Sequence, residues 1–459
     1  MSTPQPQSET QNNTVESSGE FTKQNILALG NKVRLSDSEE ESALEMYCYN
    51  QCGMNDTDFL KSCRGVIFHG DKLAFKAYPY TDEYSDKDCD QLKDILTDDY
   101  SKYQFYDAHE GCLIRVFYFN DKWYVTTHRK LDAFRSKWGS KESFGEIFKT
   151  AILHEYKKED SKLHAKLGQV EDETVYETFL NSLNKEFSYM FLIRNTFENR
   201  IVCAASATYT VYNAGTYNSN HDFIMENDSC IPYPTKHTFS TFDQLREHVN
   251  KAGFESTAGI IIFGENNKQW KLLNHEYVTL FEARGNEPSI KFRYLQVRMD
   301  KDKTNALYFL YPRYADTFDD YENTIYDVAR SINNNYIRRF IKKKYVTVPT
   351  EEYVVMKACH TWHLEDRGKN RISLRKVFEL LNQQSPTNLN KMIRRFNAEK
   401  KTETEEEVKK RRPRAKSDLD ETPEASSPKS SEGKESTSES VDTKITETQQ
   451  PAQAVVASP

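Results

Sequence analysis

The sequence predicts an α+β protein in which an antiparallel-sheet domain is followed by an all-helical domain, with a disordered tail at each end. Short alternating apolar runs separated by turn residues extend from Phe21 to about Arg293, whereas apolar residues recur every three to four positions beyond Asp316. All Phe, Tyr and Trp residues lie between Phe21 and Phe396. Residues 1–20 and 403–459 therefore lack the apolar surface that would offset the entropy cost of ordering.

The strands are predicted from three hairpin patterns in the first part of the chain. In each pattern, two runs rich in β-branched and aromatic residues flank a short polar turn. The three segments are residues 65–79, 112–128 and 259–273, with turns at 69–72, 120–122 and 265–268. Consecutive hairpins of this kind favour antiparallel pairing.

Helices are predicted in both domains from apolar spacing and start signals. In the first domain, residues 143–156 and 241–251 show helical spacing after Ser143 and Thr241. In the second domain, the pattern predicts helices at 321–345, 350–361 and 373–383, and a basic helix at about 389–400. We therefore expect a first domain at residues 21–300 and a helical domain at 316–402.

Composition excludes two classes of protein. A hydrophobic content of 37% in 459 residues is enough to build cores, which excludes disorder throughout. No stretch approaches the roughly 18 apolar residues of a membrane span, and the first 20 residues lack the apolar core of a signal peptide. The eight cysteines are scattered without CxxC pairs. We expect a soluble intracellular protein with reduced thiols and no membrane partner.

The charge distribution points to one basic region in an acidic chain. The net charge is −7, yet residues 331–400 contain 15 Lys and Arg against 6 Asp and Glu. Cations lie beside aromatic residues there, a composition suited to phosphate contact and base stacking. We expect RNA or other nucleic acid to bind here, although this basic face could instead pair with the acidic first domain. The candidate residues are Arg338, Arg339, Lys342, Lys343, Lys344, Arg394 and Arg395.

Two further patterns admit more than one interpretation. The basic cluster from Lys409 to Lys416 fits a nuclear import signal, a counter-ion patch for nucleic acid or a solvated charge run. Cys359, His360 and His363 suggest metal ligation, but a zinc site needs four ligands and no second Cys or His pair lies near in sequence. We therefore predict that these three residues are half-buried helix residues and that the protein has no metal site.

Six segments, in order, resemble the RNA ligases of the phage RNA-repair type, which are covalent nucleotidyltransferases. Ser62–Phe68 resembles the family's arginine-glycine strand, Ala77–Tyr80 the proline-aromatic segment after it, and Tyr106–Ile114 the nucleophile motif. Trp123–Ser136 is similar to the strand and turn that follow the nucleophile, and Tyr189–Val202 to the aromatic-acid strand. Thr257–Phe263 resembles the acid-glycine strand and Lys271–Asn286 the closing lysine motif. The resemblance implies a nucleotidyltransferase (ATP-grasp-like) antiparallel-sheet domain.

The resemblance also implies which chemistry has been lost. In that family a lysine amine attacks the α-phosphorus of ATP, carboxylates position the ribose and a divalent metal, and lysines neutralise the phosphates. Ala108 stands where the nucleophilic lysine is expected, and a methyl group cannot attack phosphorus. The other degenerate positions are Leu192 or Ile193, depending on a one-residue gap, then Ala258 and Leu273.

Several family positions are retained, so residual nucleotide binding is expected at Arg64, Glu110, Gly111, Gly259 and Lys271. The resemblance as a whole implies a pseudoenzyme without a cofactor. The alternative is an active ATP-dependent RNA ligase or nucleotidyltransferase with relocated catalytic residues, which would need ATP and Mg²⁺. His109, next to the lost lysine, is a candidate nucleophile for that alternative, but it is expected to point to the opposite face of the strand.

The combination of dead ligase-like motifs, a helical second half and a charged tail also resembles the immediate-early infected-cell protein family of iridoviruses. That resemblance implies a viral early protein that acts in the host cell nucleus or cytoplasm. It would act by binding RNA or nucleotide, or host or viral proteins. A purely structural, virion-associated role is a third possibility, in which neither ATP nor RNA would bind.

Overall fold

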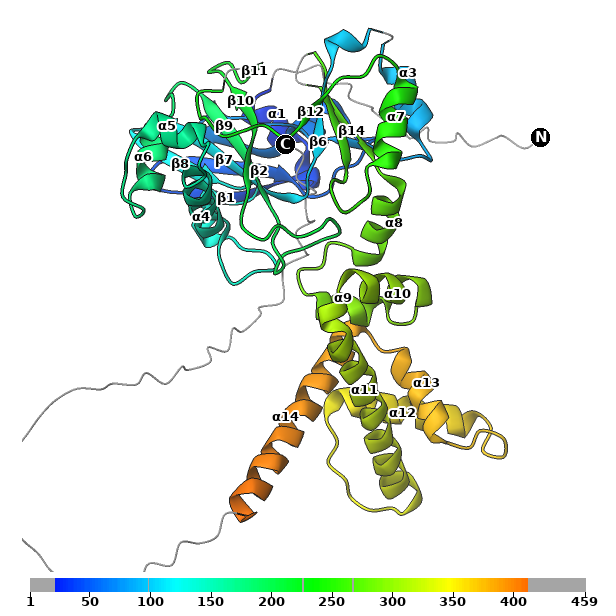
Figure 1. The fold of residues 1–459 in the computed structure, drawn as a ribbon. Coiled ribbons are helices and arrows are strands. Elements are labelled where there is room, and N and C mark those ends of the chain that lie inside the picture. Colours follow the sequence, from blue (N-terminus) through cyan, green and yellow to red (C-terminus); the bar gives the residue numbers. More distant parts are fainter. Residues whose placement is uncertain (1–20, 98, 225–226, 266–267, 412–459) are drawn as a thin grey trace, which may run out of the picture. The chain divides into compact units, whose positions relative to one another are not determined.

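The computed structural model describes residues 21–97, 99–224, 227–265 and 268–411. The chain divides into two compact units between Pro288 and Ser289, earlier than the boundary expected near residue 300 (Figure 1). The predicted tails at 1–20 and 412–459 lie outside the described residues. Helix α14, Pro386–Arg411, continues past the predicted boundary at 402, because the Glu- and Lys-rich sequence there has high helix propensity.

Three sheets build the first unit, which confirms the α+β class with antiparallel pairing dominant. One pair, β14 with β5, is parallel. The four-stranded sheet A has the order β1-β2-β3-β4, sheet B has β12-β6-β13-β14-β5 and sheet C has β11-β10-β9-β7-β8. The bounds are β1 Val33–Glu39, β2 Leu44–Tyr49, β3 Arg64–His69, β4 Lys72–Phe75, β5 Asp82–Tyr84, β6 Gln104–Ala108, β7 Gly111–Phe119, β8 Lys122–Thr126, β9 Ser188–Arg194, β10 Val211–Tyr217, β11 Phe223–Ile224, β12 Lys236–His237, β13 Gly259–Phe263 and β14 Gln269–Leu273.

The three predicted hairpins are confirmed. Strands β3 and β4 pair antiparallel, as do β7 with β8 and β13 with β14. The β7–β8 turn has positive φ at Asn120 and Asp121, the residue types that tolerate the left-handed conformation of a tight hairpin turn. The residues of the local turns therefore favour the pairing of these strands.

Helices α4 and α6 cover the outer face of sheet C, α3 and α7 cover that of sheet B, and α1 and α2 pack with strands of sheet A. Helix α4 begins one residue after Ser143, which forms a reciprocal capping box with Glu146, and α7 begins after the capping residue Thr241. Both helices were predicted. The helices are α1 Lys23–Ala28, α2 Asp58–Ser62, α3 Cys89–Ile95, α4 Phe144–Tyr156, α5 Lys162–Leu167, α6 Val175–Asn181, α7 Phe242–Lys251 and α8 His275–Arg284.

Strand alternation divides the apolar residues of this unit among separate cores. One face of sheet C packs against α4 and α6, and the outer face of sheet B packs against α3 and α7. A central cluster joins the remaining faces of the three sheets and includes Met46, Ala108, Leu113, Leu192 and Ile261. Because successive strand residues point to opposite faces, one residue of offset decides which core a side chain enters.

A buried arginine connects sheet C to sheet A. Arg115 on β7 has no solvent exposure, and its guanidinium donates to the carbonyls of Arg64, at 2.8 Å, and Gly65, at 3.1 Å. Gly65 has φ +66°, and a Cβ atom there would lie 2.2 Å from Nη1 of Arg115 and 2.6 Å from the carbonyl oxygen of His128. Glycine is therefore required at position 65 for both conformation and space.

The second unit is helical, as predicted. Helix α11 is its central element and packs against α12, α13 and α14. The buried residues of α11, which include Ile325, Val328 and Ile332, recur at helical spacing. The helices are α9 Ile290–Val297, α10 Lys301–Leu310, α11 Ala315–Tyr336, a π-helical turn at Ile337–Ile341, α12 Thr350–Glu365, α13 Leu374–Asn382 and α14.

Membrane insertion through a helix finds no support in the described part of the chain. None of its helices combines the length and the apolar character that crossing a bilayer requires.

Replacing Gly65 by alanine tests the link between sheets A and C. We expect Gly65→Ala to lower the free energy of unfolding by more than about 3 kcal/mol, because the methyl group would overlap the Arg115 guanidinium and the His128 carbonyl. Urea denaturation measures the change. Gly70→Ala is the matched control, since Gly70 has φ +60° with nothing within 4 Å of an added Cβ, and should cost only about 1 kcal/mol. Equal losses for the two variants would contradict this account.

Candidate functional site

At the position of the expected nucleophile, the side chain is a methyl group and its neighbours are apolar. Ala108 ends β6, is fully buried and packs in the central cluster with Leu113, Leu192 and Ile261. Its carbonyl accepts hydrogen bonds from the backbone of Ala258 and the hydroxyl of Thr257, each at 2.9 Å. A lysine amine at this position would be desolvated among apolar side chains, so the surroundings match a methyl group.

The structure decides between the two candidates for the lost acid on β9. Leu192 lies in the central cluster with Ala108, whereas Ile193 belongs to the core between sheet C and helices α4 and α6. The sequence leaves both residues open, and Ile193 lies on the opposite face of β9 from Leu192. Leu192 is the residue that faces Ala108.

The retained glycines make room for neighbouring strands. A Cβ atom at Gly111 would lie 2.1 Å from the carbonyl oxygen of Ile193, and one at Gly259 would lie 2.1 Å from that of Leu272. Strand packing alone therefore requires glycine at both positions. The two remaining degenerate positions lie beside Gly259: Ala258 precedes it and is fully buried, and Leu273 is its partner on β14.

The carboxylate of Glu110 accepts hydrogen bonds from backbone amides. Its carboxylate oxygens accept hydrogen bonds from the backbone N–H groups of Val202, at 2.9 and 3.0 Å, and Cys203, at 2.8 Å. Burial raises the pKa of Glu110, and these N–H donors act in the opposite direction. Glu110 thus fastens the 201–203 segment to the β6–β7 junction.

Lys271 is fully buried on β14 and faces Glu83 of β5. The two strands pair in parallel at this point, and Nζ of Lys271 lies 3.0 Å from Oε1 of Glu83. Burial lowers the pKa of Lys271, while the charge of Glu83 raises it. Arg64 and Glu110 are also close enough for their charges to act on this amine. Three retained family residues, Arg64, Glu110 and Lys271, are therefore brought together.

Arg64 and Arg115 carry buried positive charge without a carboxylate partner among the described residues. Arg64 is 3% exposed and donates to the carbonyl of Pro79 at 3.2 Å. The Nε atoms of both arginines are buried without a hydrogen-bond acceptor in the described part of the chain. Burial, followed by the charge of Arg64, lowers the pKa of Arg115 to about 9. Sequence reasoning missed Arg115 because a single arginine in an apolar strand carries no motif.

A cavity of about 370 Å³ adjoins this arginine pair. Pro79, which accepts the Arg64 hydrogen bond, and Tyr217, whose pKa responds to the charges of both arginines, belong to its lining. The lining also contains the aromatic rings of Tyr80 and Trp270, the cations Lys61, Lys76 and Lys268, and the acids Asp58 and Asp82. Its volume falls within the range of small-molecule sites. None of the degenerate positions lines it.

Gln269 gives the cavity an unpaired polar group. Its side chain is 5% exposed, and neither its amide nitrogen nor its carbonyl oxygen has a hydrogen-bond partner in the described structure. Gln269, Lys271 and Leu273 alternate on one face of β14, so the amide lies two residues from the buried amine. A buried amide without partners is costly, which favours a ligand with both donor and acceptor atoms.

His109 lies against sheet C. Its ring stacks on Tyr212 of β10, with centroids 5.1 Å apart and an interplanar angle of 16°. Burial, followed by the charge of Arg194, lowers its pKa to about 4, so the imidazole is neutral near pH 7. Among the described residues it is not part of the central cluster that holds Ala108.

In the helical unit, one group of the predicted nucleic-acid residues forms an exposed patch. Arg338, Lys342, Lys343 and Lys344 are exposed around the end of the π-helical turn, beside Tyr345, which is 90% exposed. We call Arg338, Lys342, Lys343, Lys344 and Tyr345 the basic patch.

The other predicted cations, Arg339, Arg394 and Arg395, interact with neighbouring residues of the helical unit. Arg339 donates to the carbonyl of Val346 and stacks over Tyr353. Arg395 pairs with Glu351 at 3.0 Å, and the charge of Arg394 acts on Tyr321 near the start of α11.

The Cys359 motif has protein partners. His360 stacks on Phe340 with centroids 4.0 Å apart, and Nδ1 of His363 lies 2.6 Å from the carbonyl oxygen of Asn370. Cys359 is buried on α12.

Comparison with curated proteins shows the family. The chain is 30% identical over 370 residues to the immediate-early protein ICP-46 homolog of Invertebrate iridescent virus 6, covering 76% of this chain and 79% of that protein. The chain belongs to the iridovirus immediate-early protein ICP-46 family. The ICP-46 homolog of Invertebrate iridescent virus 3 is 29% identical over 353 residues, covering 72% of this chain and 73% of that protein. ICP-46 of Frog virus 3 is 24% identical over 259 residues, covering 54% and 62%.

Solved structures similar to this ICP-46 family member include nucleic-acid ligases. A putative ATP-dependent DNA ligase from Aquifex aeolicus aligns with a TM-score of 0.34 and 12% identity, covering 62% of this chain and 68% of the ligase. An archaeal ATP-dependent RNA ligase aligns with a TM-score of 0.32 and 7% identity, covering 62% and 74%. At these scores the superpositions carry no argument about the site. No family model matches the chain.

The ICP-46 helical unit contains a buried acid whose titration is measurable. Glu352 on α12 is 7% exposed; burial, followed by the charges of Glu399 and Glu351, raises its pKa to about 7, against the opposing charge of Arg395. Because the pKa of Glu352 is higher in the folded state than its ordinary value of 4.5, the folded protein holds this proton more tightly than the unfolded chain does. The resulting stabilisation is fully present below about pH 4.5 and is lost as the pH rises through about 7. Between these values we expect the free energy of unfolding to fall by roughly 1–2 kcal/mol, allowing for screening by water.

Urea denaturation from pH 5 to pH 8 tests this assignment. Glu352→Gln should flatten the decline, because glutamine carries no titrating proton. Glu365→Gln, at the exposed end of the same helix, should leave the decline unchanged. A decline that persists in Glu352→Gln would assign it to another group.

Proposed function

We propose that this ICP-46 family member is a non-catalytic RNA-binding protein that acts early in viral infection. In this proposal the first unit descends from an RNA-ligase-like nucleotidyltransferase and no longer transfers AMP, and the second unit contacts RNA phosphates. The observation that carries it is the fully buried methyl group of Ala108, packed in hydrocarbon where the resemblance places an attacking amine.

The loss of chemistry extends beyond one residue. Leu192 replaces an acid opposite Ala108, and Glu110 already receives backbone hydrogen bonds from Val202 and Cys203. Carboxylates that could hold a divalent metal ion are therefore lacking at the described positions around Ala108. Without the amine and the metal, the α-phosphorus of ATP lacks the family's attacking lysine and a metal ion to neutralise its charge.

Binding capacity is supported by positive charge in both units. Arg64 and Arg115 are buried with no carboxylate partner among the described residues, and Pro79, which accepts a hydrogen bond from Arg64, lines a cavity together with Lys76 and Lys268. In the second unit, exposed cations of the basic patch surround Tyr345, a ring available for base stacking. We propose the cavity as a place where an RNA end or a nucleotide is held, and the basic patch of the second unit as a separate surface that contacts RNA phosphates.

An active enzyme with relocated groups is the alternative, and His109 is its specific candidate. A neutral imidazole has a lone pair able to form a phosphoramidate. The ring stacks on Tyr212, which packs against the Ala108 cluster. The lack of metal-holding carboxylates at the described positions around Ala108, rather than the place of this ring, favours the non-catalytic proposal.

Incubation with ATP labelled at the α-phosphate tests the catalytic half of the proposal. We expect no labelled protein band after denaturing electrophoresis, with or without Mg²⁺ or Mn²⁺. A band in the unmodified chain that disappears in His109→Ala would assign nucleotidyl transfer to His109 and overturn the proposal. A band that persists in His109→Ala would also overturn it and would place the nucleophile elsewhere.

Fluorescence polarisation with a labelled single-stranded RNA tests the binding half. We expect Lys342→Glu/Lys344→Glu to weaken binding at least about tenfold at low salt and to reduce the salt slope by about 0.7 for each lost phosphate contact. Lys291→Glu/Lys301→Glu makes the same charge change at exposed positions of α9 and α10 and should have a much smaller effect. Equal weakening by both pairs, or affinity that ignores salt, would contradict the RNA assignment. Tighter binding to DNA would replace RNA as the ligand.

A further inference from the structure

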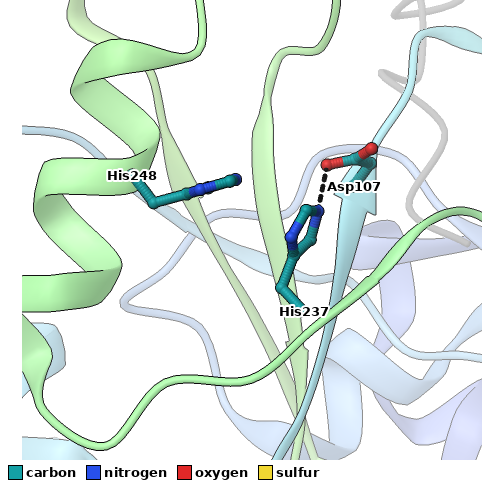
Figure 2. A group of neighbouring side chains, drawn as sticks. All are labelled: Asp107, His237 and His248. Atoms are coloured by element: carbon teal, nitrogen blue, oxygen red, sulfur yellow. Dashed lines mark hydrogen bonds and ion pairs between the residues drawn. The ribbon is translucent and has the colours of Figure 1, made fainter.

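A cluster of metal-ligating side chains lies on the outer face of sheet B, outside the cavity and the basic patch. Asp107, His237 and His248 each offer one ligand atom, and these atoms all lie within 4.8 Å of one another. The residues come from three elements: β6, β12 and α7 (Figure 2). The three positions are far apart in the sequence, so no spacing motif predicts the cluster, and the sequence-based expectation of no metal site did not consider it.

Strand alternation places Asp107 on this face. Tyr106 and Ala108 point into the central cluster, so the residue between them points outward. The backbone N–H of Asp107 donates to the carbonyl of Thr235 at 3.0 Å, just before β12, which holds His237 beside β6. Nε2 of His237 lies 2.8 Å from Oδ1 of Asp107.

Helix α7 brings the third side chain. Its buried residues Phe242, Leu245 and Val249 pack on sheet B and fix the helix, and His248 lies next to that face near the last turn. The rings of His237 and His248 are 4.4 Å apart, and Phe239 packs beside both. Figure 2 shows the His248 ring pointing from the helix towards His237.

The chemistry and exposure of the three groups suit a transition-metal ion. Two imidazoles and one carboxylate are a common ligand set for Zn²⁺, with water in the fourth position. His237 and Asp107 are only 21% and 17% exposed, which limits competition from water while leaving an entry path. Tetrahedral ligands at about 2.0–2.1 Å from zinc lie about 3.3 Å apart. Small side-chain rotations would therefore bring these atoms to that spacing.

We propose that Asp107, His237 and His248 form a binding site for one Zn²⁺ ion, which fastens α7 and β12 to β6. The ion replaces the proton that His237 and Asp107 share in their hydrogen bond, and a water molecule completes its coordination. Because the three ligands come from separate elements, the bound ion cross-links them and stabilises the folded first unit by mass action. The proposal is independent of the proposed RNA-binding function.

Titration of the metal-free full-length protein with Zn²⁺, in competition with a chromophoric chelator, tests the site. We expect one high-affinity ion per chain, and at least about tenfold weaker binding in Asp107→Asn, His237→Gln and His248→Gln. His275→Gln is the matched control, since His275 is an exposed histidine at the start of α8, and should bind zinc as the unmodified chain does. Zinc should raise the Tm of the unmodified chain and of His275→Gln, but not that of His248→Gln.

Co²⁺ substitution separates this site from the cysteines. We expect the visible absorption of a nitrogen- and oxygen-ligated ion without intense sulfur-to-metal charge-transfer bands. His248 is half-buried on a helix held by other residues, so His248→Gln should retain the circular dichroism of the unmodified chain. Unchanged zinc affinity in His248→Gln, thiolate bands with Co²⁺, or no stoichiometric binding would each overturn the proposal.

Discussion

The first unit depends on a buried guanidinium that has no carboxylate partner among the described residues. Arg115 reaches from sheet C to the carbonyls of Arg64 and Gly65 in sheet A, and Gly65 lacks the Cβ atom that would block this approach. Burying an arginine in this way is costly unless its donors are satisfied, and two backbone carbonyls satisfy much of the demand. The same arrangement leaves net positive charge beside the cavity, so a structural constraint and the proposed anion affinity share one side chain.

At the ligase-like positions, the residues that match the family have structural contacts of their own. Gly111 and Gly259 make room for the carbonyls of Ile193 and Leu272, and Glu110 holds the 201–203 segment through backbone amides. These residues stabilise strand packing whether or not a nucleotide binds. Ala108 and Leu192, by contrast, face the central cluster, where hydrocarbon packs more favourably than an unpaired charge. Retention of the family residues Glu110, Gly111 and Gly259 is therefore explained by strand packing alone.

The helical unit adds a separate surface, and only part of its predicted cation set contributes to it. Lys342, Lys343 and Lys344 follow the π-helical turn at Ile337–Ile341, and their side chains are exposed, as is that of Tyr345. Lys343 has a left-handed backbone conformation. Arg395 is paired with Glu351. Composition identified the basic region, but helix packing decided which of its charges are available to a ligand.

The sequence by itself determined the α+β class, the three hairpins, the capped starts of α4 and α7 and the loss of the amine at Ala108. These features depend on local turn chemistry, periodicity or the identity of one residue. Only the tertiary structure decided that Leu192 rather than Ile193 faces Ala108, that Arg115 bonds to sheet A, that helix continues through residues 403–411, and that Asp107, His237 and His248 converge. A strand's register relative to its neighbours and the meeting of distant elements depend on which apolar faces pack together, and that is a property of the whole fold rather than of any short segment.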